Sequence, residues 1–406
     1  MREVVDRAWD LLAEANNEAE SPRFYRLGDV LVELDDATMP MVPRPFSVDG
    51  LRLTLDRLAD WTTVTAKGEE KVAVPTKETL GGMLATRPAA ALPVLEGVVS
   101  VPYLAPDGRV VTAEGYDPTT GLYLTVRDLQ VPLVPDRPTD AELDEARRLL
   151  LDDLLVDFPF TSKADQTNAV GALLLPLVRP SIEGPTPLHM IEAPIEGSGK
   201  GLLSNIITQI AVGGLPAIMT EGSGEDEWRK RLTAALLRTP PVLLLDNLKG
   251  RIDSAALSAA LTAHVWTDRM LGTSRLVELP IRTVWLATAN NPAYSGEIAR
   301  RVCRIRLDAG VERPWERKDF RHPDLLAWVS ENRGRLVWAL LTLARNWVSA
   351  GRPAGQEVIG SFDNWAQVVG GILAEAGIEG LLGNREEVYL QAESETEGWR
   401  GLLNEW

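Results

Sequence analysis

A glycine-containing turn that ends in a lysine is the segment of this sequence with the clearest chemistry. An apolar run, LHMIEA, is followed by PIEGSGK and then by GLLSNIITQIA, which has the composition of a helix. Glycines let backbone N–H groups curl around an anion, and the amino end of the following helix points at the same place. The lysine adds a positive charge that can reach the β- and γ-phosphates of a nucleotide. The pattern predicts a phosphate-binding loop with contacts from one continuous run: Pro194, Glu196, Gly197, Ser198, Gly199, Lys200, Gly201 and Leu202.

The loop departs in two places from the strict pattern G-x-x-x-x-G-K-[ST]. Pro194 stands where the first glycine belongs, and Gly201 replaces the hydroxyl residue that usually binds Mg²⁺. The loop tolerates a glycine after the lysine, whereas a direct metal contact from a hydroxyl is not expected here. A glycine-rich turn beside a surface lysine is the alternative interpretation of this segment taken alone.

A second apolar run, PPVLLLDN, ends in an acid about 45 residues after the loop. A carboxylate at the tip of a strand beside a phosphate loop can hold the water shell of Mg²⁺, so Asp246 is the predicted metal-site residue. Asn247 occupies the next position, where a glutamate would be suited to activate water. Either the base lies elsewhere, with Glu221, Glu225 and Glu227 the nearest acids by strand order and Glu227 the candidate, or hydrolysis is slow.

Two further segments carry side chains suited to phosphate chemistry. The run RTVWLATANNP is another buried strand, and Asn290 or Asn291 at its end could orient an attacking water; an Asn-Pro turn is the alternative. The run EIARRVCRIRLD follows and contains Arg300 and Arg301. An arginine that stabilises transition-state charge on a nucleotide can be worth about 10³ or more in rate. A solvated pair of surface arginines is the alternative here.

These segments lie within an alternation of short apolar runs and helical runs. Between residues 186 and 310, the strand-like runs LHMIEA, PAIMT, PVLLLD and IRTVWLATAN alternate with helical ones. Such alternation predicts an α/β fold in which a parallel sheet is covered by helices on both faces. The carboxyl ends of parallel strands meet at one edge, which is where a ligand binds in such sheets.

The regions on either side of this core are predicted to be separate units. Residues 1–135 mix helical stretches, strand-like runs and Pro/Gly turns, which indicates an α+β domain, expected to serve as an oligomerisation or DNA-binding collar. Residues 136–185 are predicted to form a helical connector, with Thr139 as a helix cap and a second helix over about 165–178. Residues 311–406 are expected to form a helical lid and the start of a C-terminal extension. The core of the lid should contain three tryptophans: Trp328, Trp338 and Trp347.

Composition narrows the classes of function. The net charge of −16 argues against a protein that coats nucleic acid over its whole surface. Residues 249–350 hold 16 Lys/Arg against 10 Asp/Glu, a balance of +6 that leaves −22 for the rest. That balance fits a nucleic-acid groove, a phosphate-binding subunit interface or ordinary solvated surface.

Targeting and redox signals are also informative. No apolar run reaches the length of a membrane span, and the acidic amphipathic start is not that of a signal peptide. With one cysteine and three histidines, neither an internal disulfide nor a structural zinc site is expected. The cytoplasm is the predicted compartment.

The order of the motifs resembles that of a known family. A phosphate loop, a DN strand, an ATxNN strand and an RR pair follow one another in AAA+ ATPases related to superfamily III and MCM-type helicases. The segments DNLKGRIDSAALSAALTAHVW, RPWERKDFRHPDLLAWV and SFDNWAQVVGGILAEAGIEGLLGN resemble replicative helicases or primase-helicases of bacterial phages and mobile elements. PVLEGVVSVPYLAPDGRVVTAEGYDPTTGLYL resembles the part that precedes the ATPase in those proteins, so the resemblance covers nearly the whole chain.

The resemblance implies a homo-oligomeric ring, usually a hexamer, that hydrolyses ATP with Mg²⁺ and moves along DNA. It assigns phosphate binding to Lys200, Mg²⁺ to Asp246 and sensing of the γ-phosphate to Asn290 or its neighbour. Arg300 or Arg301 would reach the nucleotide of the adjacent subunit. Related proteins often carry an amino-terminal primase, which makes a primase a candidate partner.

The same resemblance places a pre-sensor hairpin, which points into the pore of such helicases, between the DN and ATxNN strands. In LGTSRLVELP, turn residues stand between strand-like arms. The expected DNA contacts are Lys249, Thr273, Ser274 and Arg275. The leading hypothesis is an ATP-dependent DNA helicase; the alternative is a non-translocating AAA+ initiator or helicase-loader switch, which Asn247 in place of a glutamate makes credible.

Overall fold

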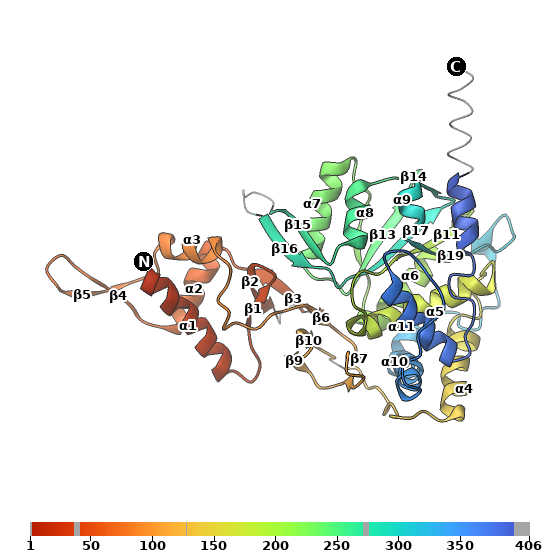
Figure 1. The fold of residues 1–406 in the computed structure, drawn as a ribbon, viewed down its shortest axis with the longest axis horizontal. Helices are drawn as coiled ribbons and strands as arrows, with labels where there is room; N and C mark the ends of the chain where they lie inside the picture. The colour runs from red at the N-terminus through yellow and green to blue at the C-terminus, as the bar shows by residue number, and fades with distance from the viewer. Residues whose placement is uncertain (1, 36–40, 127, 271–275, 394–406) are drawn as a thin grey trace, which may run out of the picture.

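A five-stranded parallel sheet forms the centre of the chain (Figure 1). The computed structural model describes residues 2–35, 41–126, 128–270 and 276–393. The strand order is β12-β13-β17-β11-β19, and every neighbouring pair is parallel. The expected mixed α/β architecture with a parallel sheet is confirmed. Its strands are β11 (Leu188–Ala193), β12 (Ala217–Met219), β13 (Val242–Leu248), β17 (Val284–Asn290) and β19 (Val302–Arg306).

Helices cover the sheet on both faces, because its strands alternate apolar side chains to either side. On one face, α6 (Lys200–Val212) packs through Ile206, Ile207 and Ile210. On the other face, α7 (Glu225–Leu236) and α8 (Ala255–Thr262) pack with the hairpin β15–β16 (Val265–Arg269 and Leu276–Pro280). The antiparallel hairpin therefore lies where the sequence predicts one. Short elements complete this region: β14 (Arg251–Ile252), β18 (Ala293–Tyr294) and α9 (Gly296–Ala299).

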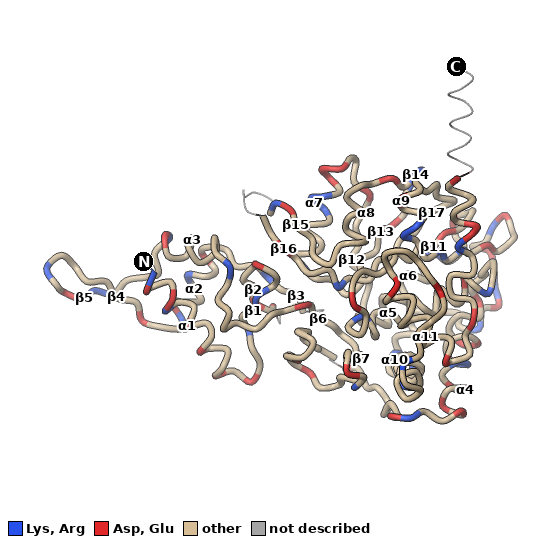
Figure 2. The backbone as a smooth tube through the Cα atoms, in the orientation of Figure 1, with Lys and Arg blue, Asp and Glu red and all other residues tan. Residues whose placement is uncertain are grey.

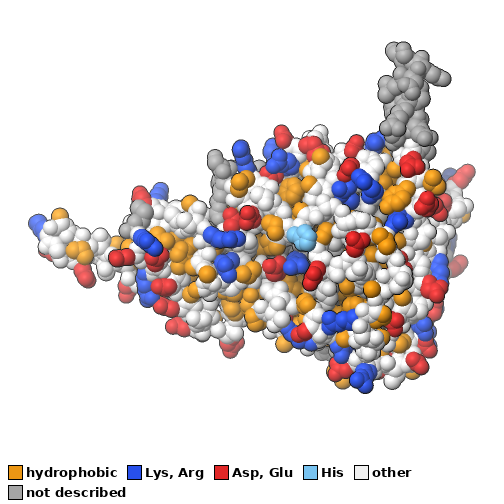
Figure 3. Space-filling model, in the orientation of Figure 1, with side chains coloured by type: hydrophobic (Ala, Val, Ile, Leu, Met, Phe, Trp, Pro, Cys, Tyr) orange, Lys and Arg blue, Asp and Glu red, His pale blue; other side chains and the backbone are white. Residues whose placement is uncertain are grey.

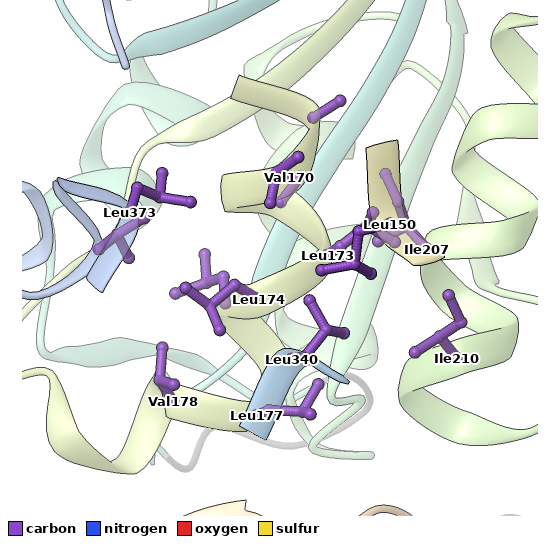
Figure 4. Close-up of a cluster of buried hydrophobic side chains, with 14 of the residues drawn as sticks. Leu150, Val170, Leu173, Leu174, Leu177, Val178, Ile207, Ile210, Leu340 and Leu373 are labelled. Atoms are coloured by element: carbon purple, nitrogen blue, oxygen red, sulfur yellow. The ribbon is translucent and has the colours of Figure 1, made fainter. Parts of the chain in front are cut away.

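Helix α5 (Lys163–Val178) packs on β19 beside α6, and a second helical layer lies outside these two helices. It consists of α4 (Asp140–Arg148) with its continuation Leu149–Leu154, α10 (Leu325–Ser349) and α11 (Asp363–Glu375). Figure 4 shows leucines and valines of α5 meeting side chains of α6, α10 and α11 in one apolar cluster. The cap at Thr139 is a full capping box with Glu142. Two 3₁₀ turns, Arg179–Ser181 and Pro314–Glu316, lie beside these helices.

The tryptophan-rich helix α10 belongs to this layer. Trp338 and Trp347 are buried in the main core, and Trp328 packs against that core while partly exposed. The expected packing role of these tryptophans is therefore confirmed. Helix α10 contacts α4, α5, α6 and α11, so it supports the back of the sheet.

A lobe with its own apolar core projects from the sheet domain (Figure 1). Its hairpin β4–β5 is largely exposed and stands clear at the end of the molecule (Figure 3). The lobe contains α1 (Arg2–Glu18), β1 (Phe24–Leu27), β2 (Val30–Asp35), β3 (Val42–Pro45), α2 (Val48–Leu58), β4 (Trp61–Val64), β5 (Glu70–Ala73) and α3 (Lys77–Ala85).

Residues 97–124 join the lobe to the body. They form β6 (Gly97–Val99), β7 (Tyr103–Leu104), β8 (Val110–Val111), β9 (Gly115–Asp117) and β10 (Leu122–Leu124). Strand β7 packs on α5 and α10.

The turn between β1 and β2 touches the hairpin β15–β16 of the sheet domain. Gly28 has φ of +57°, and a Cβ atom there would lie 1.7 Å from the carbonyl oxygen of Glu278 in β16. The backbone N–H of Glu278 donates to Asp29 at 3.0 Å. Only glycine fits this close approach. Around it, Leu27 and Val30 of the lobe share an apolar cluster with Val277 and Leu279 of β16.

Charges of both signs are spread along the chain (Figure 2). Within the described residues, no helix has the length and apolar character that crossing a membrane requires.

Candidate nucleotide-binding site

The turn between β11 and α6 has the backbone of an anion-binding loop. Gly197 and Gly199 have φ of +75° and +97°, a conformation that favours glycine, and Gly199 is the N-cap residue just before α6. The Ser198 hydroxyl donates to the carbonyl of Ile195 at 2.8 Å, which closes the turn. The amino end of a thirteen-residue helix thus opens onto the loop, as anion binding requires. Gly201 has open space beside it.

Lys200 links the loop to the strand that the sequence singles out separately. Its Nζ donates to Asn290 Oδ1 at 2.6 Å and to the carbonyl of Ile195 at 3.4 Å. The two residues are 90 positions apart in sequence, and they meet because β11 and β17 are adjacent. Burial lowers the pKa of Lys200, against the opposing effect of the charges on Glu196 and Asp246. A half-buried ammonium group held by one amide oxygen would gain from a phosphate partner.

Asp246 lies at the carboxyl edge of the sheet, one strand further from the loop. Its Oδ1 accepts a hydrogen bond from Thr288 Oγ1 at 2.6 Å. The same hydroxyl accepts from the backbone N–H of Asn247 at 2.7 Å, where φ is +54° and the β13–β17 register shifts. This bulge turns the half-buried carboxylate to the edge while leaving its second oxygen available for a hydrated cation. The sequence motifs did not indicate Thr288. The feature that could have identified it is its position two residues before Asn290, which places both side chains on the same face of β17.

The two asparagines after β17 face different partners. Asn290 accepts from Lys200, whereas Asn291 Oδ1 accepts from Arg306 Nη2 at 3.1 Å. Asn291 has φ of +40°, and its backbone N–H donates to the carbonyl of Ala193 at 3.1 Å. The structure therefore distinguishes Asn290 as the residue that faces the phosphate loop.

The three candidate acids for activating water are all engaged in the structure. Glu225 accepts from the backbone N–H of Ala256 at 2.8 Å, and Glu221 accepts from that of Lys249 at 3.3 Å. Glu227 pairs with Arg231 at 2.9 Å, and this hydrogen bond lowers the pKa of Glu227. A carboxylate with a lowered pKa is a weaker base. The role of Glu227 as the catalytic base therefore remains a prediction. Through its bond to Lys249, Glu221 lies beside the segment that follows Asp246.

Arg300 and Arg301 lie near the amino ends of the sheet strands, whereas the loop follows the carboxyl end of β11. Leu188, at the start of β11, pairs with Val302, and the loop begins only after Ala193. Five residue steps at roughly 3.3 Å each separate the two edges by about 17 Å. Both arginines pair with Glu297 at 2.9 Å, and Arg300 is exposed. Neither side chain can reach the phosphate loop of its own chain.

The residues expected to contact DNA are described only in part. Lys249 is exposed just after β13. Thr273, Ser274 and Arg275 lie outside the described residues, although the arms of their hairpin are present as β15 and β16.

A cavity of about 410 Å³ adjoins the loop. Phe158, Leu202 and Trp315 line it beside Gly197 and Gly199. Trp315 is 60% exposed, and a Cβ atom on Gly197 would lie 3.0 Å from its ring. Apolar pockets of this size hold ligands such as a nucleoside, and aromatic faces suit a base. Of these lining residues, only Leu202 and the glycines were predicted, because neither the segment of Phe158 nor that of Trp315 has a spacing that places it beside the loop.

The donor set at this edge fits Mg²⁺. Asp246 supplies one carboxylate, and substrate phosphates commonly supply the rest of the protein-bound ligands of this ion. Among the described residues, no group of three or more His, Cys, Asp or Glu side chains could hold a metal by itself. A cation here would therefore depend on the nucleotide.

Comparison with known proteins gives little likeness in sequence. No protein-family model matches the chain, and no curated protein matches it. Among solved structures, the C-terminal region (305–718) of NrS-1 is similar over 71% of this chain and 67% of its own, with 11% identity and a TM-score of 0.32. JCV helicase is similar over 64% of this chain and 69% of its own, with 13% identity and a TM-score of 0.22. At these scores, the strand order and loop geometry remain the basis for interpreting the site.

Proposed function

We propose that this chain is an AAA+ P-loop ATPase that works as an ATP-dependent DNA helicase of a phage or mobile element. The observation that carries the proposal is the contact of Lys200 with Asn290, beside Asp246 and Thr288, at the carboxyl edge of a parallel sheet. A lysine, an amide and a carboxylate converge there on the amino end of α6. This combination suits the binding and cleavage of a nucleoside triphosphate.

The site divides the nucleotide between two environments. The loop and Lys200 bind the phosphates, and the cavity lined by Phe158 and Trp315 takes the nucleoside. Mg²⁺ held through Asp246 would neutralise developing charge on the phosphates. When phosphate replaces Asn290 as the partner of Lys200, the amide of Asn290 becomes free to orient a water molecule.

A ring explains the position of the arginine pair. Because Arg300 and Arg301 lie far from the loop of their own chain, an action on nucleotide would be on that of an adjacent subunit. We propose a homo-oligomer, a hexamer by resemblance, in which each site is shared. The hairpin β15–β16 and Lys249 would then contact DNA in the pore through its phosphates.

A second function, a non-translocating initiator or loader switch, is favoured by one observation. Asn247, at the position next to Asp246, offers no base, and Glu227 is held in an ion pair. Slow hydrolysis would suit a protein that uses ATP to change its assembly state. The two functions differ in whether DNA strands are separated.

The deciding experiment measures ATP hydrolysis and unwinding of a forked DNA by the full chain and by Lys200→Ala. We expect hydrolysis to fall at least tenfold in the variant, because the phosphate-facing charge is removed. Lys77→Ala is the matched control, since Lys77 is exposed on α3 in the projecting lobe. Equal turnover by all three proteins at saturating ATP would exclude the nucleotide site. Hydrolysis without unwinding would favour the switch.

A further inference from the structure

A buried ion pair joins the carboxyl ends of β11 and β19. The Glu192 side chain is fully buried, and its Oε1 accepts from Arg306 Nη1 at 2.7 Å. Its other oxygen, Oε2, accepts a hydrogen bond from the Tyr294 hydroxyl. A buried carboxylate with both oxygens engaged has one well-defined orientation, and it fixes the arginine that pairs with it.

The Arg306 guanidinium also contacts the residue that follows β17. Arg306 Nη2 donates to Asn291 Oδ1 at 3.1 Å, while Nη1 stays with Glu192. Asn291 has φ of +40°, which is unfavourable for a residue with a side chain, so the turn needs support to persist. Support comes from Arg306 on the side chain and from the Ala193 carbonyl on the backbone.

From these contacts we infer that Arg306, held by Glu192, is a positioning residue that sets the direction of Asn290 at the phosphate site. The inference rests on the proposed function. The fork of one guanidinium ties the end of β11, which leads into the phosphate loop, to the end of β17, which carries Asn290. A change at the loop and a change at the sensor are therefore coupled through one side chain. The role differs from that of Arg300 and Arg301, because Arg306 lies at the same edge as the loop.

Arginine suits this role because its planar guanidinium holds its donors in a rigid fork, so both partners are fixed in one geometry. Arg306→Lys keeps a positive charge beside Glu192 and avoids leaving a buried carboxylate unpaired. A lysine presents a compact charge and loses the fork to Asn291. The double variant Glu192→Gln with Arg306→Gln removes both charges and gives a second route if the lysine variant is unstable.

The test measures kcat, the affinity for a non-hydrolysable ATP analogue, and thermal stability in the full chain. For Arg306→Lys we expect kcat to fall about tenfold with analogue affinity changed less than about twofold, the pattern of lost transition-state positioning. Asn291→Ala should cause a similar fall. In the double variant, kcat should lie within about twofold of the lower of the two single-variant values, because both changes break the same contact.

Arg282→Lys is the matched control. Arg282 pairs with Glu96 at 3.1 Å just before β17 begins, at the opposite end of that strand from Asn290. This variant should keep the kcat of the unaltered chain. Losses of kcat that multiply in the Arg306→Lys, Asn291→Ala double variant would overturn the inference, as would parallel losses of affinity and stability. If Lys200→Ala hydrolyses normally, the proposed function fails instead, so the two failures are distinguishable.

Discussion

His189 lies in the strand that leads into the phosphate loop and makes the stability of the fold sensitive to acid. Its side chain is fully buried and meets the Trp365 ring edge-on, with ring centroids 5.8 Å apart. Burial lowers the pKa of His189 from 6.5 to about 4, because the charged imidazolium is poorly solvated there. Between pH 4 and pH 6.5, His189 is therefore protonated in the unfolded chain and neutral in the folded chain.

The sign and size follow from linkage. Stability due to the neutral imidazole is fully present above pH 6.5 and is lost as pH falls toward 4. A lowering of about 2.5 pKa units corresponds to about 3 kcal/mol, since one unit is worth about 1.4 kcal/mol. Replacing the imidazole by an apolar group removes this dependence. We therefore expect the unfolding free energy of His189→Leu, relative to that of the unaltered protein, to increase by about 3 kcal/mol when the pH is lowered from 7.5 to 4.

The assay is urea unfolding followed by tryptophan fluorescence at several pH values over this range. The quantity of interest is the difference in unfolding free energy between the two proteins, because other titrating groups cancel in it. Ile191→Val serves as the control, since Ile191 is buried in the same strand and carries no titrating group, so its difference curve should be flat. A flat curve for His189→Leu would refute the reasoning, because the buried imidazole would then titrate normally.

Four further predictions concern the candidate site. Gly197→Val should weaken nucleotide binding without unfolding the chain, because φ of +75° is strained by about 1–2 kcal/mol for a residue with Cβ; calorimetric titration with an ATP analogue checks this. Trp315→Leu should weaken binding of ATP but hardly that of inorganic triphosphate, if the indole contacts the base; equal losses would place Trp315 elsewhere. Arg300→Ala subunits mixed with Lys200→Ala subunits should recover ATPase activity, because some interfaces then combine an intact loop with an intact arginine; strict additivity after verified exchange would argue against shared sites. Arg275→Ala should weaken DNA binding and flatten its salt dependence by about one unit of slope, as for one lost phosphate contact; an unchanged slope would contradict the assignment.

The parts of the fold that depend on local pattern could be predicted from the sequence. LHMIEA and PVLLLD are short, mainly apolar runs of the kind that forms strands buried on both faces, and they lie in β11 and β13. Glycines at 197 and 199 predict the loop because their positive φ values are costly for other residues. The helix expected over 165–178 begins two residues earlier, at Lys163.

The residues that the sequence analysis missed are those whose roles come from long-range pairing. Thr288 acts on Asp246 across two strands, and Arg306 acts on Asn291 and Glu192 from a third. No spacing along the chain encodes such contacts, since they depend on which strands are neighbours. The same holds for Trp315, which reaches the loop from a segment more than 100 residues away.

The close approach of Gly28 to Glu278 gives the projecting lobe a mechanical role. With a backbone oxygen occupying the space of a side chain, the junction cannot slide, and the hairpin strand carries the lobe with it. The lobe extends well beyond the body (Figure 1), and at its base Leu27 and Val30 share an apolar cluster with Val277 and Leu279 of β16, so the lobe and the hairpin form one continuous arm. A small tilt of the hairpin therefore becomes a larger sweep of the exposed β4–β5 tip, and a distance measured from that tip to the body would report hairpin motion in magnified form.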